Sequence, residues 1–182
     1  HTEGDRLKFI NCRILGNQDT IYTGAKFTRL YFKDCYIDGT TDFIFGPSTA
    51  LFENCMIHSK RNSYVTAAST PKEAKYGYIF KHCKLTAEPG VDKVYLGRPW
   101  RPYAYTLFIE CELGKHIVPA GWHNWGKQSN EETARYMEYK NTGEGANVSE
   151  RVAWSKQLTK KEAEAVTVDA IFGTQSNWNP ID

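Results

Sequence analysis

The chain has little of several features that mark particular protein classes. Its 182 residues include only two methionines and seven prolines, and 23 basic against 21 acidic residues leave a net charge of +2. So small an imbalance provides no basic surface for nucleic acid or an anionic membrane. No apolar run approaches the roughly 20 residues of a membrane-spanning helix. The polar opening residues 1–5 predict no signal peptide in this stretch. With 24% charged and 14% aromatic residues, the composition excludes a disordered chain and predicts one folded domain.

The cysteines are few, and their placement is informative. Five is too small and odd a number for a disulfide framework. Each cysteine ends a four-residue motif that begins with phenylalanine, at Phe9–Cys12, Phe32–Cys35, Phe52–Cys55, Phe80–Cys83 and Phe108–Cys111. The motifs recur every 20–28 residues, and sequence repeats of this length indicate a solenoid. We interpret the cysteines as small buried side chains at one position of a repeating coil, and none has the short spacing of a metal site.

Short alternating segments surround these motifs and are typical of β-strands. One set ends at the phenylalanine, at 8–10, 30–32, 50–52, 78–80 and 106–108, and a second set follows the cysteine, as at 35–37 and 83–85. Helical spacing of apolar residues is missing from residues 1–120. We therefore predict an all-β fold, a right-handed single-stranded parallel β-helix. Its coils would stack about 4.8 Å apart and align the Phe and Cys side chains in ladders.

Residues 1–182 are predicted to form one β-helix domain, with coils over 1–126 and the last coil or coils and a C-terminal tail over 127–182. Residues 158–165 predict a short helix capped by Thr159, with Glu162 at the capping-box position. Differences in repeat length predict loops at Ser59–Ser63 and Glu88–Asp92 that bulge on one side and contribute to a binding face.

Three segments are unlike the rest of the repeat, namely Gly16–Tyr22, Gly39–Gly46 and Tyr95–Trp100. Asp19 and Asp42 are one repeat apart, the same step that separates the first two Phe-x-x-Cys motifs. Residues one repeat apart in a solenoid are vertical neighbours, so the two carboxyl groups should share one face. Either aspartate alone would more often cap a turn, and the prediction depends on the pair.

Two neighbouring carboxylates repel each other, which raises one pKa unless a cation intervenes. Arg98, in a rigid Gly-Arg-Pro segment, could pair with Asp42 and keep it ionised. Asp19 would then be the protonated partner, which provides a nucleophile and a general acid. The neighbouring Gln18 offers an amide donor that could stabilise an oxyanion.

Taken together and in this order, the motifs Gln-Asp-Thr-x-Tyr at 18–22, Gly-x-x-Asp-Phe-Ile-Phe-Gly at 39–46 and Leu-Gly-Arg-Pro-Trp at 96–100 resemble the pectin methylesterases (pectinesterases, carbohydrate esterase family 8). The resemblance extends from about residue 1 to the Trp-Asn-Pro at 178–180. It implies a parallel β-helix that hydrolyses galacturonate methyl esters in pectin and leaves pectate, with no metal or organic cofactor.

By the same motif match, the resemblance implies a role for each residue. Asp42 would be the nucleophile, and Asp19 would be the acid that protonates methanol and then the base that activates water. Gln18 would help form the oxyanion hole, and Arg98 would orient Asp42 and contact substrate. The remaining substrate-contacting residues implied are Trp100, Tyr22 and Phe45, with Met137 and Arg61 at the cleft rim. A polyanionic sugar chain needs such aromatic surfaces and cations, and Tyr103 adds to them.

Several features depart from the family pattern or extend beyond the site. The sequence begins inside the β-helix, so we expect the C-terminal part of a larger catalytic domain, without the second oxyanion glutamine of the preceding coil. The resemblance does not imply that this stretch is active by itself. Pectin is the expected partner of a monomer that binds neither nucleic acid nor membrane. Because pectin lies in cell walls, a secreted or periplasmic location is expected.

Two other classes remain open from the residues. A pectate lyase or polygalacturonase could share the β-helix, but a lyase would need a calcium cluster and an inverting glycosidase would need carboxylates roughly 6.5–9.5 Å apart. A non-catalytic β-helical adhesin or carbohydrate-binding protein would keep the ladders and the aromatic cleft without needing Asp19 and Asp42. The adjacent aspartates with a neighbouring glutamine favour ester hydrolysis.

Overall fold

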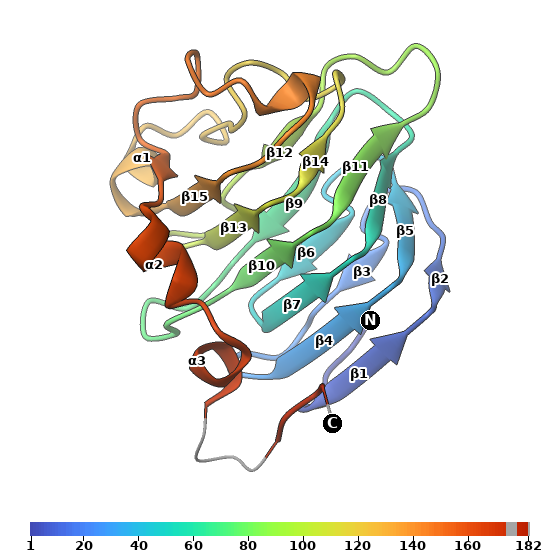
Figure 1. Ribbon diagram of the computed structural model, residues 1–182, viewed down its shortest axis with the longest axis vertical. Helices are drawn as coiled ribbons and strands as arrows, with labels where there is room; N and C mark the ends of the chain where they lie inside the picture. Colours follow the sequence, from blue (N-terminus) through green and yellow to red (C-terminus); the bar gives the residue numbers. More distant parts are fainter. Residues whose placement is uncertain (174–177, 182) are drawn as a thin grey trace.

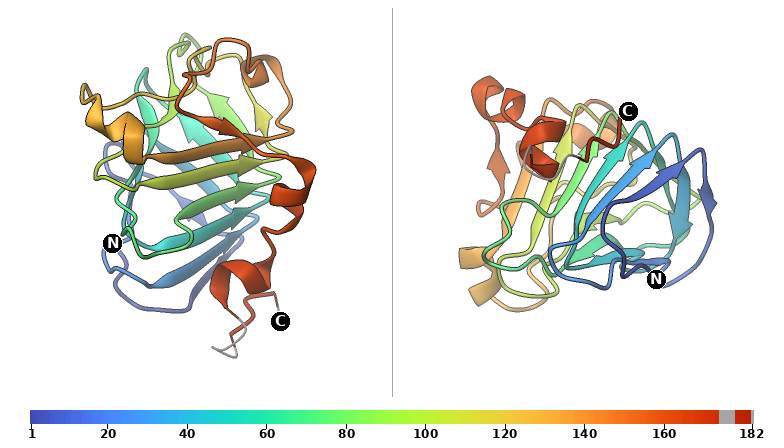
Figure 2. Two further views of the ribbon diagram at one scale, coloured as in Figure 1. Left: turned by 90° about the vertical axis from the view of Figure 1, so that its left-hand side faces the viewer. Right: turned by 90° about the horizontal axis from the view of Figure 1, so that it is seen from below.

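The computed structural model describes residues 1–173 and 178–181 and shows parallel strands wound into stacked coils (Figures 1 and 2). The strands form three parallel sheets, one along each side of the coil. The first sheet contains β1 (Leu7–Ile10), β4 (Arg29–Lys33), β7 (Thr49–Glu53), β10 (Tyr78–Lys81), β13 (Tyr105–Ile109), β15 (Arg135–Tyr139) and β16 (Lys156–Gln157). The second contains β2 (Arg13–Ile14), β5 (Tyr36–Gly39), β8 (Met56–Ser59), β11 (Lys84–Ala87) and β14 (Glu112–Leu113). The third contains β3 (Ile21–Tyr22), β6 (Ile44–Gly46), β9 (Tyr64–Ala68) and β12 (Tyr95–Gly97).

The register of the first sheet places the repeated motifs directly above one another. Its phenylalanines pair in one continuous row, which consists of Phe9, Phe32, Phe52, Phe80 and Phe108. The sequence steps of the Phe-x-x-Cys motif are therefore the lengths of successive coils. This arrangement confirms the right-handed parallel β-helix, the handedness that parallel crossovers overwhelmingly adopt.

The phenylalanine row forms a stacked ladder inside the tube. Successive ring centroids are 4.4–4.6 Å apart and the rings are within 9° of parallel. This separation is close to the 4.7–4.9 Å between paired strands, so one rung of backbone carries one ring. Four of the five rings lie in the core, and Phe9 in the first coil is partly buried against them. The ladder is thus a direct consequence of the register.

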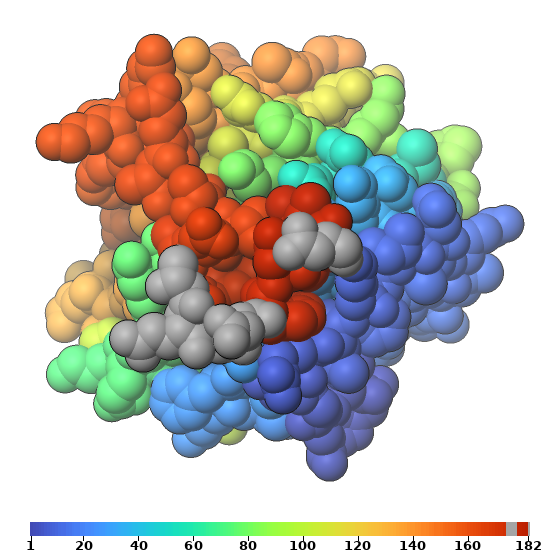
Figure 3. All heavy atoms as spheres, turned by 60° about the horizontal axis from the view of Figure 1, so that its bottom comes forward, coloured from blue at the N-terminus to red at the C-terminus, as the bar shows by residue number. Residues whose placement is uncertain are grey.

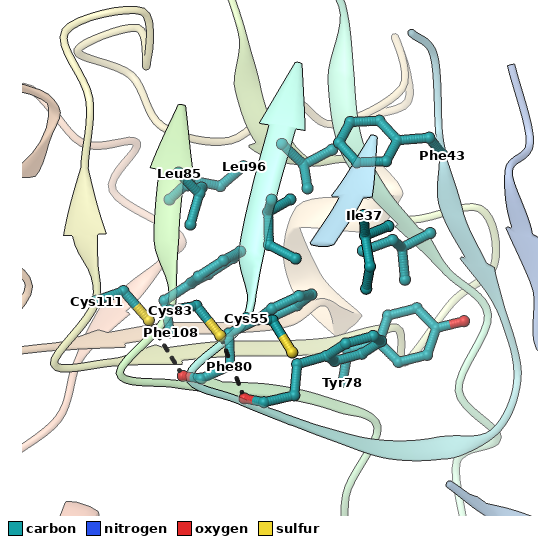
Figure 4. Packing of buried hydrophobic residues seen from close by; sticks show 14 of the residues in the cluster. Ile37, Phe43, Cys55, Tyr78, Phe80, Cys83, Leu85, Leu96, Phe108 and Cys111 are labelled. Atoms are coloured by element: carbon teal, nitrogen blue, oxygen red, sulfur yellow. Dashed lines mark hydrogen bonds between the residues drawn. The ribbon is translucent and has the colours of Figure 1, made fainter. Parts of the chain in front are cut away.

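The cysteines form a second ladder beside the rings (Figure 4). All five are free thiols, and all except the half-buried Cys12 are buried. From the second coil onward, each Sγ lies 3.3–3.6 Å from the carbonyl oxygen of the ladder phenylalanine in the coil below, where it can donate a weak hydrogen bond. This placement agrees with the prediction of small buried side chains.

A sharp corner precedes every cysteine and turns the chain from the first sheet into the second. The residue immediately before each cysteine has a φ of 50–54°, in the left-handed region. Asparagine and aspartate tolerate this region better than most residues, and they occupy three of the five corners. In the next coil Lys140 takes this corner conformation, and Asn141 stands in the cysteine position, where its Oδ1 accepts the Cys111 N–H.

The C-terminal segment covers the outer face of the first sheet. It contains α2 (Lys160–Glu164) and α3 (Val168–Phe172), while α1 (Ser129–Thr133) and the 3-10 helix η1 (Glu144–Ala146) lie before it. Figure 3 shows this orange-to-red segment against the flank of the coils. The apolar side chains that it meets form a second cluster, which includes Tyr31, Leu51, Ile79, Leu107, Val166, Ile171 and Phe172.

A buried ion pair lies at the opposite end of the tube from β1. The Arg151 Nε and Glu138 Oε1 are 2.8 Å apart, and the two side chains are only 4% and 1% exposed. Trp122 Nε1 also donates to Glu138, and Arg151 donates to the carbonyl oxygens of Pro119 and Gly145. A buried pair needs such additional partners because removing two charges from water is costly.

The sequence predictions of local structure were partly right. The helix within 158–165 is α2, and its Thr159–Glu162 capping box is present. The loop at Glu88–Asp92 is also present, and Asn62 from the preceding coil hydrogen-bonds to it. The expectation that the added length of this coil bulges at Ser59–Ser63 was largely wrong. Most of the residues by which this coil is longer than the one before it lie between β9 and β10, at residues 69–77.

Removing one ring of the ladder tests its contribution to stability. Phe80→Ala should lower the free energy of unfolding by about 3–5 kcal/mol, because the ring is fully buried and stacked on both faces. Phe27→Ala is the matched control, since Phe27 is 59% exposed, and should change stability by less than about 0.5 kcal/mol. Urea unfolding measures both, and equal effects of the two variants would contradict the ladder's role.

A buried histidine predicts a loss of stability in acid. His116 is 4% exposed and its Nε2 has no hydrogen-bond partner among the described residues. Burial, and to a smaller extent His58, lower its pKa from 6.5 to about 4. Between these values the unfolded chain takes up a proton that the folded imidazole does not, so stability falls as the pH drops from about 6.5 to about 4.

Replacing His116 should remove the part of the acid-induced loss of stability that its lowered pKa causes. Between about pH 7.5 and about pH 4.5, His116→Phe should lose less stability than the unsubstituted protein, by on the order of 2 kcal/mol. Urea unfolding of both proteins at the two pH values provides the comparison. The same acid loss in both would show that another group is responsible.

Candidate active site

The third sheet positions the two aspartates on adjacent rungs. Asp19 and Asp42 each stand two residues before a strand residue that pairs with the other coil, since Ile21 pairs with Ile44. The two coils are hydrogen-bonded at this point, because the Asp19 N–H donates to the carbonyl oxygen of Thr41 at 3.1 Å. The predicted vertical neighbours are therefore one strand spacing apart.

Both aspartates have left-handed backbone conformations, with φ of 57° for Asp19 and 49° for Asp42. Phe43 points into the core and is fully buried, while the preceding Asp42 carboxylate faces the outside of the tube. A non-glycine residue held in this region is strained, and such strain is concentrated at functional sites.

The two carboxyl groups have different environments. Asp42 is 7% exposed, whereas Asp19 is exposed and forms no ion pair within the part of the chain that the structure describes. Partial burial, together with the negative charge of Asp42, raises the pKa of Asp19 above its ordinary value. The pair is thus arranged so that Asp19 holds a proton more readily than an isolated aspartate does.

Arg98 fixes the second carboxylate through a two-pronged ion pair. Its Nε donates to Asp42 Oδ1 at 3.0 Å and its Nη2 donates to Oδ2 at 2.8 Å. The preceding Gly97 lets the backbone approach the coil below, because a Cβ there would lie 2.0 Å from Thr66 Oγ1. The Arg98 N–H then donates to the Thr66 carbonyl oxygen. The glycine thus sets the position from which the guanidinium reaches Asp42.

Two aromatic rings, one from before Arg98 in the sequence and one from after it, pack against the guanidinium. The Arg98 Cζ lies 3.9 Å from the Tyr64 ring centroid and 3.7 Å from the Trp125 ring centroid. Both distances fall well inside the range of cation–π contacts. The guanidinium therefore has its plane held by rings and its edge held by Asp42.

Three further aromatic rings form a patch beside the carboxylates. Tyr22 stacks on Phe45 with centroids 4.6 Å apart, and Trp100 meets both rings edge-on at 6.4 and 5.9 Å. Tyr22 and Phe45 are in register on adjacent strands, which explains their stacking. Flat apolar faces beside charged groups suit the faces of sugar rings.

The structure gathers most of the predicted site residues around one pocket. Its volume is about 270 Å³, and it is lined by Gln18, Asp19, Asp42, Phe45, Ala67, Arg98, Trp100 and Trp125. Gln18 is exposed at this pocket, where its amide is free to approach a ligand. Tyr22 is not part of this lining, but its ring contacts the lining residues Phe45 and Trp100.

Two predicted cleft residues lie elsewhere, and a third aromatic lies outside the lining. Met137 pairs with Leu107 on the first sheet, so it points outward into the cluster beneath the C-terminal segment. Arg61 is exposed in the loop between β8 and β9 and does not line the pocket. Tyr103 contacts Lys72 instead of the pocket. Met137 and Arg61 therefore do not line this pocket, because Met137 lies on the outer face of the first sheet and Arg61 lies in the loop after β8.

Sequence reasoning missed Tyr64 and Trp125. Tyr64 follows Asp42 by one coil, because the Asp42 N–H donates to its carbonyl oxygen, and that spacing could have identified it. Trp125 belongs to a Gly-Trp-His-Asn-Trp-Gly segment after the last Phe-x-x-Cys motif. Two glycines around two tryptophans are a signal for an exposed aromatic turn, although nothing in the repeat indicates which ring reaches Arg98.

Comparison with known proteins identifies the family. The family model described as Pectinesterase matches residues 1–175. The chain belongs to the pectinesterase family. Pectinesterase 31 of Arabidopsis thaliana is 44% identical over 160 residues, which cover 87% of this chain and 50% of that protein. Probable pectinesterase A of Neosartorya fischeri is 38% identical, over 96% of this chain and 52% of that protein.

Solved pectinesterase structures have the same fold. The pectin methylesterase from carrot superposes with a TM-score of 0.86 at 34% identity, over 93% of this chain and 57% of that chain. A pectin methylesterase in complex with a hexasaccharide superposes with a TM-score of 0.79 at 31% identity, over 97% of this chain and 59% of that chain. Among the curated pectinesterases compared, the chain spans 31–52% of the relative's own length.

Within residues 1–173 and 178–181, no group of three or more His, Cys, Asp or Glu side chains could hold a metal ion. In the same part of the chain, no helix is both long and apolar enough to cross a membrane.

Proposed function

We propose that this site hydrolyses the methyl esters of galacturonate units in pectin, releasing methanol and leaving de-esterified pectate. The observation that carries the proposal is the unequal pair of carboxyl groups. Asp42 is held by Arg98 in a fixed orientation, while the pKa of its neighbour Asp19 is raised. A nucleophile beside a proton donor is what acyl transfer from an ester requires.

In the first step, an Asp42 oxygen attacks the ester carbonyl carbon. Each carboxylate oxygen accepts only one N–H from Arg98, so each keeps a lone pair for attack. The carbonyl oxygen becomes an oxyanion, to which the Gln18 amide can donate. When the intermediate collapses, the C–O bond to the methoxy group breaks, and the Asp19 proton passes to that oxygen to give methanol. The product is an anhydride between Asp42 and the galacturonate.

In the second step, the anhydride is hydrolysed. Asp19 is now a carboxylate and accepts a proton from water as the water oxygen attacks the galacturonyl carbon. The bond from that carbon to the Asp42 oxygen breaks, which restores the Asp42 carboxylate and releases galacturonic acid, whose carboxyl proton passes to solvent to leave galacturonate. Asp19 has regained its proton, so both groups return to their starting states.

The rest of the pocket supports a galacturonan substrate. The patch of Tyr22, Phe45 and Trp100 offers faces on which pyranose rings can pack. Similarity adds to this, because a structural neighbour was solved with a hexasaccharide. Because pectin is a cell-wall polymer, we propose a secreted or periplasmic enzyme that acts as a monomer.

Replacing the proposed nucleophile tests the mechanism. Asp42→Asn should lower kcat for methanol release from methyl-esterified pectin by at least about 10⁴-fold, because a neutral amide cannot form the anhydride. The matched control is Asp34→Asn, an exposed aspartate with a similar φ of 53°, which should keep its activity. Methanol release with an unchanged thermal unfolding midpoint provides the measurement. Turnover by Asp42→Asn at the unsubstituted rate would exclude covalent catalysis by this residue.

A conservative change tests the two-pronged ion pair. Arg98→Lys keeps the positive charge but loses the planar fork, so Asp42 should lose its fixed orientation. We expect kcat to fall by about 10²-fold. Lys84→Arg, at an exposed ion pair with Glu112 on the second sheet, is a control for exchanging the two cations. If Arg98→Lys retained full kcat, orientation by the guanidinium would not contribute.

A further inference from the structure

The loop over residues 121–128 adds a partial rung above the last strand of the third sheet. Trp122 forms a parallel bridge with Gly97, and the His123 N–H donates to the Gly97 carbonyl oxygen at 3.1 Å. The chain then turns, and Trp125 has a φ of 63°. This turn brings the Trp125 ring to 3.7 Å from the Arg98 guanidinium.

The turn is held by an imidazole acceptor. The Trp125 backbone N–H donates to His123 Nδ1 at 3.1 Å. Burial, followed by the nearby charge of Arg98, lowers the pKa of His123, which favours the neutral ring, and because Nδ1 accepts the Trp125 N–H the ring proton is assigned to Nε2. The His123 ring lies against Tyr64 and Tyr95, with centroids 5.5 and 5.4 Å away, which fixes its orientation.

The acceptor matters because the conformation that it holds is unfavourable. A bulky residue in the left-handed region is strained and persists only where surrounding contacts determine it. The following residues use the same device, because Asn124 Oδ1 accepts the Gly126 N–H at 2.8 Å. In each case a side chain accepts the backbone N–H two residues ahead, and for Trp125 that side chain is His123.

We propose that His123 is a positioning residue: its imidazole holds Trp125 over the Arg98 guanidinium, and so keeps Arg98 aligned on Asp42. His123 does not line the pocket, whereas Trp125 does. Its influence therefore passes through the tryptophan to the guanidinium and from there to the carboxylate. The rings of Tyr64 and Trp125 form the two sides of a clamp whose second side depends on His123.

This inference deepens the proposed function and rests on it, because an aligned Asp42 matters for attack on the ester. Loss of the clamp would leave Arg98 charged but free to rotate away from Asp42. The expected consequence is mainly a lower kcat, because Asp42 loses its fixed orientation, and the effect on KM should be small, since it would arise only from the changed position of Trp125 in the pocket lining.

Two substitutions at this position separate the hydrogen bond from the ring. His123→Phe keeps a flat ring between Tyr64 and Tyr95 but offers no acceptor. His123→Asn loses the ring but can accept an N–H two residues ahead, as Asn124 does. We expect His123→Phe to lower kcat for methanol release by about tenfold with KM within about twofold, and His123→Asn to recover most of kcat. His58→Phe, a half-buried histidine on β8, is the control for the ring change and should leave both constants unaltered.

A second measurement reads the clamp without catalysis. The Arg98 Nε–H resonance, identified by its loss in Arg98→Lys, reports both the hydrogen bond to Asp42 and the ring currents of the two aromatic residues. It should shift or broaden in His123→Phe and return close to its original position in His123→Asn. Thermal unfolding checks that each variant is folded.

The outcomes distinguish this inference from the proposed function. A folded His123→Phe with unchanged kcat and an unchanged Arg98 resonance would overturn the positioning role. Failure of His123→Asn to restore either quantity would also overturn it, because the acceptor would not be the operative feature. If the unsubstituted protein released no methanol, the proposed function would fail, while the Arg98 resonance would still decide whether the clamp exists.

Discussion

The fold depends on the corner before each cysteine, where one residue in a left-handed conformation turns the chain at the same point in every coil. A strand that entered the next sheet one residue early or late would exchange its inward and outward side chains. The shared corner prevents this slip, and the stacked phenylalanines on one side and the thiols on the other are its result. Variation in coil length is consequently confined to the loops, such as residues 69–77 between β9 and β10.

The site uses a second set of left-handed residues in a similar way. At the cysteine corners the left-handed residue is polar and exposed and the next side chain packs inward, and at Asp42 the polar side chain likewise faces the pocket just before the buried Phe43. The strained positions are tolerable because hydrogen bonds between neighbouring coils fix the backbone around them. The same rigidity lets Arg98 reach across the intervening coil to Asp42 without a flexible segment. A stiff scaffold of this kind suits a reaction that needs little conformational change.

The sequence predicted the parts of the structure that repeat. The first two sheets, the buried thiols and the adjacency of Asp19 and Asp42 all followed from the recurrence of the Phe-x-x-Cys motif. The third sheet was not recognised as a sheet, because its strands are short and are interrupted by the residues of the site. Met137 was misplaced because a resemblance to a family supplies residues without supplying the strand on which they lie. Trp125 was missed because the turn that carries it is irregular, and only the fold brings it over Arg98.

The path of the C-terminal segment has a consequence for how the coils come apart. Stacked repeats normally touch only their neighbours, so their ends can fray one at a time. Here the chain leaves the last coil and returns along the flank to the early ones, where the Arg29 guanidinium donates to the Phe172 carbonyl oxygen and lies near the Trp178 ring. The returning segment acts as a strap that joins distant rungs. Loosening of the first coils therefore also disturbs contacts made by the end of the chain, which makes a linear array unfold more nearly as a single cooperative unit.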